Sequence, residues 1–246
     1  MASDPDEELR AAAITGLALE LRAAAEVGRL DRAALTIAEL DDAPVDRRAV
    51  LAALDDWGAA VRAAGSGDRS AGMDALTRLL GRDLGFTGDR DTYDHPDNSF
   101  LPKVLARRRG LPITLSILYL EVARRAELPL FGIALPGHFV VGYRVGDGVT
   151  VTDPFAGGAL CARADLEALV ARAGGRFHPA MLSPATPVEI VARVLRNLLG
   201  SYQRRHRLAA AGAVAALWAG FAPDDRSAAS AVAEVAEAEA AAARLN

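Results

Sequence analysis

The stretch that decides the fold reads Arg107-Arg108-Arg109-Gly110-Leu111-Pro112-Ile113-Thr114-Leu115-Ser116. Its three arginines and its glycine predict the end of one helix, because cations favour a helix C-terminus and glycine readily adopts the left-handed conformation that ends it. Proline is tolerated in the first turn of a helix, so Pro112 predicts the start of a second helix that extends to about Ala126. Apolar residues recur along this second helix at helical spacing, which indicates a buried face.

The sequence pattern changes from helical to strand-like after this helix. Residues 130–135, 138–145 and 149–153 are short and rich in Val, Ile and Phe, so they predict strands, and Gly146-Asp147-Gly148 predicts a hairpin turn. A two-residue Gly146-Asp147 loop would pair Val140 with Asp153 and leave His138 diagonal to it on the same face, at roughly 7–8 Å between backbones. An Asp147-Gly148 loop would separate the two side chains, so the sequence leaves both registers open.

The chain divides into three regions. Residues 1–84 predict a helical N-terminal region, in which Ser3 or Asp4 is a suitable cap for the first helix. Residues 85–185 form the predicted core, and residues 186–246 predict a C-terminal helical region. Thr186-Pro187-Val188-Glu189 is a strong helix start, with a cap, an early proline and a glutamate at the third position.

The composition bounds the class of protein. The chain has 246 residues, 51% hydrophobic and 24% charged, with a net charge of −4, which is typical of a soluble globular protein. Nothing in this balance indicates attraction to nucleic acid or to a membrane surface. The acidic start of the chain does not resemble a secretion signal and no apolar run is long enough to span a bilayer, so we expect a cytoplasmic location.

No metal or cofactor is predicted. Asp89, Asp91, Asp94 and Asp97 are spaced somewhat like a calcium loop, but the glycine and the distal glutamate of that motif are missing, which favours a solvated loop. The four histidines lack metal-ligand spacing, and no glycine-rich phosphate loop is present. The single cysteine, Cys161, excludes an internal disulfide framework and is most simply an inert apolar residue.

The segment from Asn98 to Gly158 resembles the transglutaminase-like superfamily, and most of all its bacterial SirB-type branch of transglutaminase-like and tetratricopeptide "regulator of sirC expression" proteins. The matching motifs are Asn98-Ser99-Phe100-Leu101-Pro102, Arg107 to Ser116, Leu135-Pro136-Gly137-His138-Phe139 and Asp153-Pro154-Phe155. The resemblance implies an α+β fold with a papain-like core, in which a helix packs on a small antiparallel sheet between helical flanks. It also implies that the C-terminal helices are a degenerate tetratricopeptide-like region.

In active members of the superfamily a cysteine begins the central helix, a histidine lies on a strand and an aspartate on the next strand. His138 and Asp153 match the last two residues. The cysteine position falls near Pro112 to Thr114, where this chain has no cysteine. The SirB-type branch lacks it too, so the resemblance implies a pseudoenzyme or an enzyme that does not use a thiol.

The sequence therefore yields two sets of candidate site residues. His138 is a candidate general base, Asp153 the residue that orients it, and Thr114 a candidate nucleophile, or simply a helix cap. The candidate ligand contacts are Asn98, which is otherwise a cap, Ser116, and Arg109, which with its neighbouring arginines suits an anionic group at the cleft edge.

Three functions remain open at this stage. The first is a domain without the catalytic cysteine that binds a peptide- or amide-like ligand around His138 and Asp153, with or without processing it. The second is an active amidase or acyl or aminoacyl transferase with His138 as general base. The third is a non-catalytic regulatory protein whose helical flanks bind a protein partner.

Overall fold

The computed structural model describes residues 5–41 and 43–244. Its α-helices are α1 (Pro5–Glu26), α2 (Leu30–Ala38), α3 (Arg47–Gly65), α4 (Arg69–Thr77), α5 (Leu101–Arg107), α6 (Pro112–Arg125), α7 (Arg163–Arg172), α8 (Pro187–Arg204), α9 (Leu208–Phe221) and α10 (Arg226–Ala243). Its strands are β1 (Thr87–Gly88), β2 (Arg109–Gly110), β3 (Phe131–Leu135), β4 (His138–Val145), β5 (Gly148–Asp153) and β6 (Ala159–Cys161). Short π- or 3₁₀-helical turns are η1 (Arg78–Asp83), η2 (Pro96–Asn98), η3 (Pro154–Ala156) and η4 (Pro179–Leu182).

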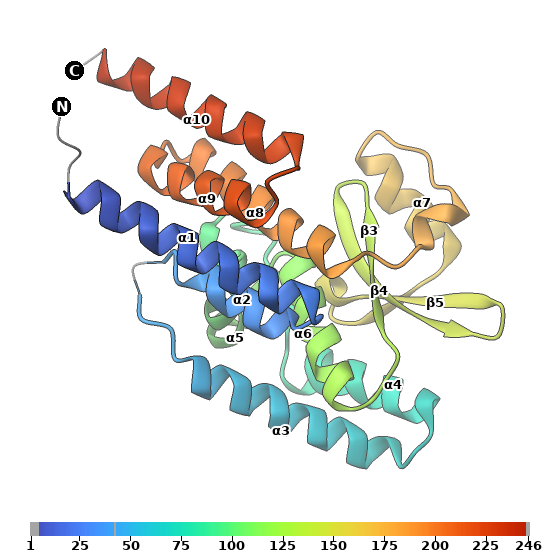
Figure 1. Ribbon diagram of the computed structural model, residues 1–246. Helices are drawn as coiled ribbons and strands as arrows, with labels where there is room; N and C mark the ends of the chain where they lie inside the picture. The colour runs from blue at the N-terminus through green and yellow to red at the C-terminus, as the bar shows by residue number, and fades with distance from the viewer. Residues whose placement is uncertain (1–4, 42, 245–246) are drawn as a thin grey trace.

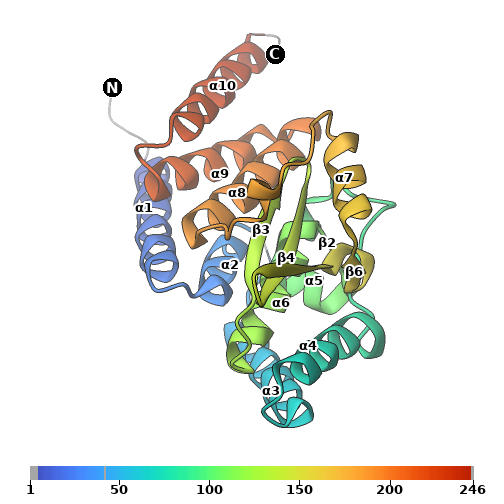
Figure 2. The ribbon, with the colours of Figure 1, turned by 90° about the vertical axis from the view of Figure 1, so that its right-hand side faces the viewer.

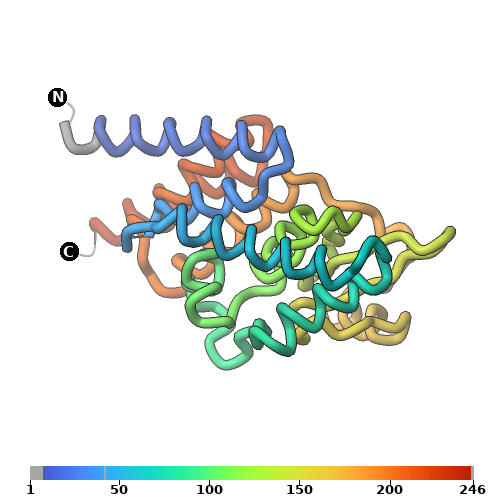
Figure 3. The backbone as a smooth tube through the Cα atoms, turned by 90° about the horizontal axis from the view of Figure 1, so that it is seen from below, coloured from blue at the N-terminus to red at the C-terminus, as the bar shows by residue number. Residues whose placement is uncertain are grey.

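The architecture is α+β and mostly helical, with a four-stranded antiparallel sheet in the order β3-β4-β5-β6 (Figure 1). Helix α6 packs against β4 and is buried from Pro112 to Ala123, so it is the central helix of the fold. On its other sides α6 contacts α2, α3 and α8. Helix α3 crosses the lower face of the molecule (Figures 1 and 3). The predicted helix from Pro112 on a small antiparallel sheet is therefore present.

The sheet separates two apolar clusters. Phe139 and Val141 of β4 belong to the larger cluster, which contains α6 and most of the other helices. Val140, between them, belongs to a smaller cluster with Leu166 and Val170 of α7. Successive side chains of a strand point to opposite faces, so α6 and α7 cover opposite faces of the sheet. Figure 2 shows α7 beside the sheet and α6 behind its strands.

The hairpin between β4 and β5 decides the register. Val145 pairs with Gly148 across a two-residue Gly146-Asp147 loop, and the same alignment brings Val141 opposite Thr152. Gly146 has a φ of +56°, which a two-residue turn with glycine at its first position requires. Of the two registers that the sequence left open, the structure has the one that keeps His138 and Asp153 on the same face.

Most predicted helix boundaries are confirmed, but the residues predicted to cap the start and the end of α5 are not. Thr186 and Glu189 form the predicted reciprocal cap of α8. Helix α5, by contrast, begins after Phe100 with no side-chain cap, so the cap predicted at Asn98 is wrong. Its left-handed C-terminal residue is Arg108, with φ +56°, and not Gly110. Gly110 instead belongs to β2, which pairs in parallel with β1.

The cap predicted at Ser3 or Asp4 lies outside the described residues. Helix α1 begins, and α10 ends, on the same side of the molecule (Figures 1 and 3). Among residues 5–41 and 43–244, no helix combines the length and the apolar character needed to cross a bilayer.

Candidate functional site

His138 and Asp153 are in contact at the end of the sheet. His138 is the first residue of β4 and follows a two-residue Pro136-Gly137 turn, in which Gly137 has a φ of +68°. Asp153 is the last residue of β5. His138 Nε2 lies 3.0 Å from Asp153 Oδ2. A carboxylate at this distance favours the tautomer that carries a proton on Nε2, which leaves Nδ1 unprotonated and able to accept a proton.

Asp153 is fixed by a second contact. Its Oδ1 accepts a hydrogen bond of 2.9 Å from the backbone N–H of Phe155, so the carboxylate caps the short turn η3. The side chain of Asp153 is 9% exposed and that of His138 is 11% exposed. Both oxygens of a nearly buried carboxylate are thus engaged, which holds the imidazole in one orientation.

Phe155 forms the centre of the surrounding wall. Its ring meets His138 edge-on, with centroids 5.7 Å apart, and Tyr93 edge-on at 5.8 Å. The guanidinium carbon of Arg90 lies 5.2 Å from the same ring centroid. The motif Asp153-Pro154-Phe155 therefore supplies both the carboxylate and the aromatic surface of the site.

An open pocket of about 410 Å³ borders the His138–Asp153 pair. Its wall comes from β4, β5, η3, α7 and the loop after β1. The lining side chains besides His138 and Asp153 include Arg90, Tyr93, Phe155, Leu169 and Arg172. The volume falls in the range of roughly 300–1,000 Å³ that is usual for small-molecule sites. The pocket lies on the α7 face of the sheet, because His138 shares its face of β4 with Val140.

The two hydroxyl residues predicted from the sequence lie elsewhere. Thr114 and Ser116 are on α6, which covers the opposite face of the sheet, and neither lines the His138 pocket. Both are buried, and in the described part of the chain neither hydroxyl has a hydrogen-bond partner. Thr114 therefore does not cap α6, whose N-cap residue is Leu111.

Asn98 and Arg109 are also outside the pocket. Asn98 is fully buried, and its amide donates to the carbonyl oxygens of Thr92 (2.7 Å) and Tyr93 (3.2 Å). It thus fastens the loop that carries Arg90 and Tyr93 into the pocket wall. Arg109 is exposed on β2 and does not line the pocket.

The acidic loop is not the fully solvated segment that the sequence indicated. Asp89 is 6% exposed, accepts from both the N–H and the hydroxyl of Thr92, and pairs with Arg107 at 2.8 Å. Burial alone would raise the pKa of Asp89, but these hydrogen bonds lower it to about 2. Arg107 also donates to Asn98, so this arginine stabilises the loop and is not directed at a ligand.

Cys161 cannot replace the missing thiolate. It lies on β6, next to β5, and burial together with the charges of Asp153 and Asp165 raises its pKa to about 12. Its sulfur is therefore a protonated thiol at neutral pH and a poor nucleophile. Tyr119 of α6 is fully buried, and burial and the Asp153 charge raise the pKa of its phenol as well.

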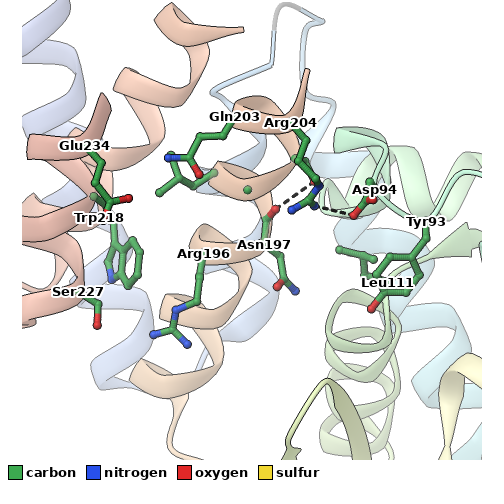
Figure 4. Close-up of a pocket in the computed structure, with 14 residues that line it drawn as sticks. Tyr93, Asp94, Leu111, Arg196, Asn197, Gln203, Arg204, Trp218, Ser227 and Glu234 are labelled. Carbon is green, nitrogen blue, oxygen red and sulfur yellow. Dashed lines mark hydrogen bonds and ion pairs between the residues drawn. The ribbon is translucent and has the colours of Figure 1, made fainter. Parts of the chain in front are cut away.

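A second cavity of about 400 Å³ adjoins the site and shares Tyr93 with it (Figure 4). It lies against α8, α9 and α10, where the guanidinium carbon of Arg196 sits 5.2 Å from the Trp218 ring centroid. Arg204 pairs with Asp94 at its rim. The residues that line this cavity include no histidine and no cysteine.

Sequence reasoning missed Arg90, Tyr93 and Arg172. Arg90 and Tyr93 lie in the loop assigned to solvent, and Arg172 lies in the last turn of α7, where a cation is ordinary. The alternation of β4 could have shown that His138 faces away from Phe139 and Val141, and hence away from the central helix. Among the described residues, no group of three or more histidine, cysteine or acidic side chains is placed to hold a metal ion.

These features fit the class of protein that comparison identifies. The chain belongs to the transglutaminase-like superfamily, whose family model matches residues 48–196. Among individual proteins, it is 41% identical over 141 residues to a UPF0162 protein of Xylella fastidiosa, covering 55% of this chain and 50% of that one. A UPF0162 protein of Pseudomonas aeruginosa is 36% identical over 135 residues, covering 53% of this chain and 49% of that one.

Similarity extends beyond bacteria. Human F-box only protein 21 is 30% identical over 140 residues, which are 54% of this chain and 22% of that protein. The chain spans about half the length of the bacterial curated relatives named above. No solved structure shows significant similarity to it.

Proposed function

We propose that this protein binds a peptide- or amide-like ligand in the His138 pocket and cleaves or transfers its acyl group without a thiol. The observation that carries the proposal is the 3.0 Å contact between His138 Nε2 and Asp153 Oδ2 at the wall of an open pocket. This is the base-and-orienter half of a catalytic triad, and His is the side chain best suited to proton transfer near neutral pH.

The chemistry uses only groups in the pocket and a water or amine. His138 Nδ1 takes a proton from the attacking water or substrate amine. At the same time the oxygen of that water, or the nitrogen of that amine, bonds to the carbonyl carbon of the ligand's amide. The resulting imidazolium is stabilised by Asp153. It then returns the proton to the leaving nitrogen as the carbon–nitrogen bond breaks, which releases an amine and leaves either a carboxylic acid or a new amide.

Water or a substrate amine is the nucleophile that we favour. Thr114 is not among the residues that line the pocket, and Cys161 is held as a thiol. The finer assignment to the SirB-type branch, in which the helix-start cysteine is absent, is part of this proposal. The cytoplasmic location expected from the sequence stays a prediction.

The test replaces His138 with alanine. Purified wild-type protein is incubated with a library of N-acetyl dipeptide amides, and released amines or new amides are detected by mass spectrometry. We expect His138→Ala to lower turnover roughly 10²–10⁴-fold, the usual contribution of a general base, without unfolding the protein. His178→Ala is the matched control, because His178 is an exposed histidine outside the pocket.

One result would overturn the proposal. If His138→Ala leaves both turnover and ligand binding unchanged, the pocket is vestigial. The helical flanks would then be the working surface, and the protein would act by binding a protein partner.

A further inference from the structure

Two arginines from separate elements line the His138 pocket. Arg90 lies in the loop between β1 and η2, with its guanidinium carbon 5.2 Å from the Phe155 ring centroid. Arg172 belongs to the last turn of α7, on the other side of the pocket. This cation–π contact holds the Arg90 guanidinium at the pocket wall without using its N–H donors.

No carboxylate in the pocket lining is free to pair with these arginines. Asp153 is the one acidic residue in its lining, and its oxygens face His138 and the Phe155 amide. Within residues 5–41 and 43–244, neither Arg90 nor Arg172 forms an ion pair with an acidic side chain. With His138 neutral, two arginines against one aspartate leave the lining net positive.

Other arginines near this region are already paired. Arg107 pairs with Asp89, and Arg204 pairs with Asp94. The two arginines that line the pocket, Arg90 and Arg172, are in contrast without an acidic partner in the described part of the chain. A ligand carboxylate is the group that a guanidinium binds best, through two parallel charge-assisted hydrogen bonds.

We infer that the His138 pocket selects ligands that carry a carboxylate close to the amide carbonyl, as in a peptide with an acidic residue beside the reacting bond. The inference rests on the proposed function, because it places the amide at His138. Arg90 and Arg172 bind the carboxylate, and the rings of Phe155 and Tyr93 cover the apolar part of the ligand. Arg90 and Arg172 are thereby specificity residues and take no part in the proton transfer.

The experiment compares two probes that differ by one charge. N-acetyl-glutamyl-glycine amide and N-acetyl-glutaminyl-glycine amide have nearly the same shape, and calorimetry measures their binding to the His138→Ala protein, which removes turnover. We expect the glutamyl probe to bind at least tenfold more tightly, since hydrogen bonds to charged groups are the strong ones. The preference should shrink as salt is raised, because partly exposed charges are screened.

The decisive variant is Arg90→Gln combined with Arg172→Gln. It should abolish the preference for the glutamyl probe. Arg144→Gln is the matched control, because the Arg144 guanidinium carbon also lies over an aromatic ring, 5.8 Å from the Phe131 centroid, but outside the pocket. The inference is overturned if the double variant still prefers the glutamyl probe, or if the His138→Ala protein with both arginines intact shows no such preference.

The two proposals fail in distinguishable ways. If the glutaminyl probe is turned over in a His138-dependent manner and no charge preference is seen, the proposed function stands and the carboxylate inference falls. If the charge preference is present and depends on the two arginines, while no amide is ever turned over, the anion site stands and the catalytic proposal falls.

Discussion

His138 Nε2 and Asp153 Oδ2 lie 3.0 Å apart although the two residues are 15 positions apart in the chain. The hairpin makes this possible, since its two-residue loop sets Val141 opposite Thr152 and keeps the two side chains diagonal on one face. A shift of one residue would turn one of them to the other face. The contact is therefore a direct consequence of the register between β4 and β5.

Asp153→Asn tests whether the carboxylate supports the imidazole. The amide keeps an oxygen that can accept from the Phe155 N–H, so the turn η3 should remain folded. The negative charge that stabilises the imidazolium is lost, and we expect turnover of an amide substrate to fall by roughly 10²-fold or more. Steady-state kinetics alongside thermal unfolding measures both effects. Full activity in Asp153→Asn would contradict the assigned role.

Cys161 provides a test against thiol chemistry. With a pKa of about 12, it is on the order of 1 in 10⁵ ionised at pH 7, and only above that pKa does the thiolate dominate. Iodoacetamide at neutral pH should therefore modify it slowly and leave turnover unchanged, as should Cys161→Ser. Mass spectrometry follows the modification. Rapid inactivation that Cys161→Ser prevents would show that the thiol takes part.

Arg193 of α8 holds the turn that carries His138. Its Nη2 donates to the carbonyl oxygens of Leu135 (2.9 Å) and His138 (3.0 Å), one on each side of the turn. Arg193→Met keeps the apolar stem but leaves both carbonyls without this donor, so we expect a loss of about 1–3 kcal/mol in the free energy of unfolding and lower turnover.

The control for Arg193 is its neighbour Arg196. Arg196 lies on the same helix, but its guanidinium carbon lies over the Trp218 ring, 5.2 Å from the centroid, so Arg196→Met should leave turnover unchanged. Urea unfolding gives the stability change, and histidine NMR signals report the position of His138. Equal effects of the two substitutions would show that Arg193 acts only through general stability.

Asp31 of α2 is expected to govern acid stability. It is fully buried and pairs with Arg125 at the end of α6 (2.6 Å) and with Arg29 (2.8 Å). Burial would raise the pKa of Asp31, but the hydrogen bonds from the two arginines lower it from 3.8 to about 2. A carboxyl whose pKa falls on folding contributes stability above its unfolded pKa. That contribution is lost as the pH falls from about 4 to about 2.

In Asp31→Asn, the free energy of unfolding should therefore fall less steeply as the pH is lowered over that range. At pH 7 it should cost about 1–3 kcal/mol, because two charge-assisted hydrogen bonds to a buried carboxylate are lost, while Arg125 keeps Glu121 as a partner. Asp55→Asn is the control, since Asp55 pairs with the same Arg125 but its side chain is 67% exposed, and its loss should cost under about 1 kcal/mol. Similar costs for the two variants in pH-dependent urea unfolding would contradict this account.

Local signals in the sequence predicted the elements well because their causes are local. Pro112 begins α6, and the reciprocal cap of Thr186 and Glu189 begins α8, since both signals act within a single helical turn. The short strands rich in Val, Ile and Phe were predicted for the same reason. The local signals failed at α5, where pairing of β1 with β2 draws Gly110 into a strand and leaves Arg108 to end the helix.

The sequence by itself determined the central helix, the three long strands and the presence of a histidine and an aspartate on neighbouring strands. The tertiary structure alone decided their register, the face of the sheet on which His138 lies and the separation of Thr114 from it. It also decided that Arg90 and Arg172, from a loop and a distant helix, border one pocket. Local patterns fix each element's conformation within a few residues. The contacts between elements follow from how their apolar faces pack, which depends on the whole chain.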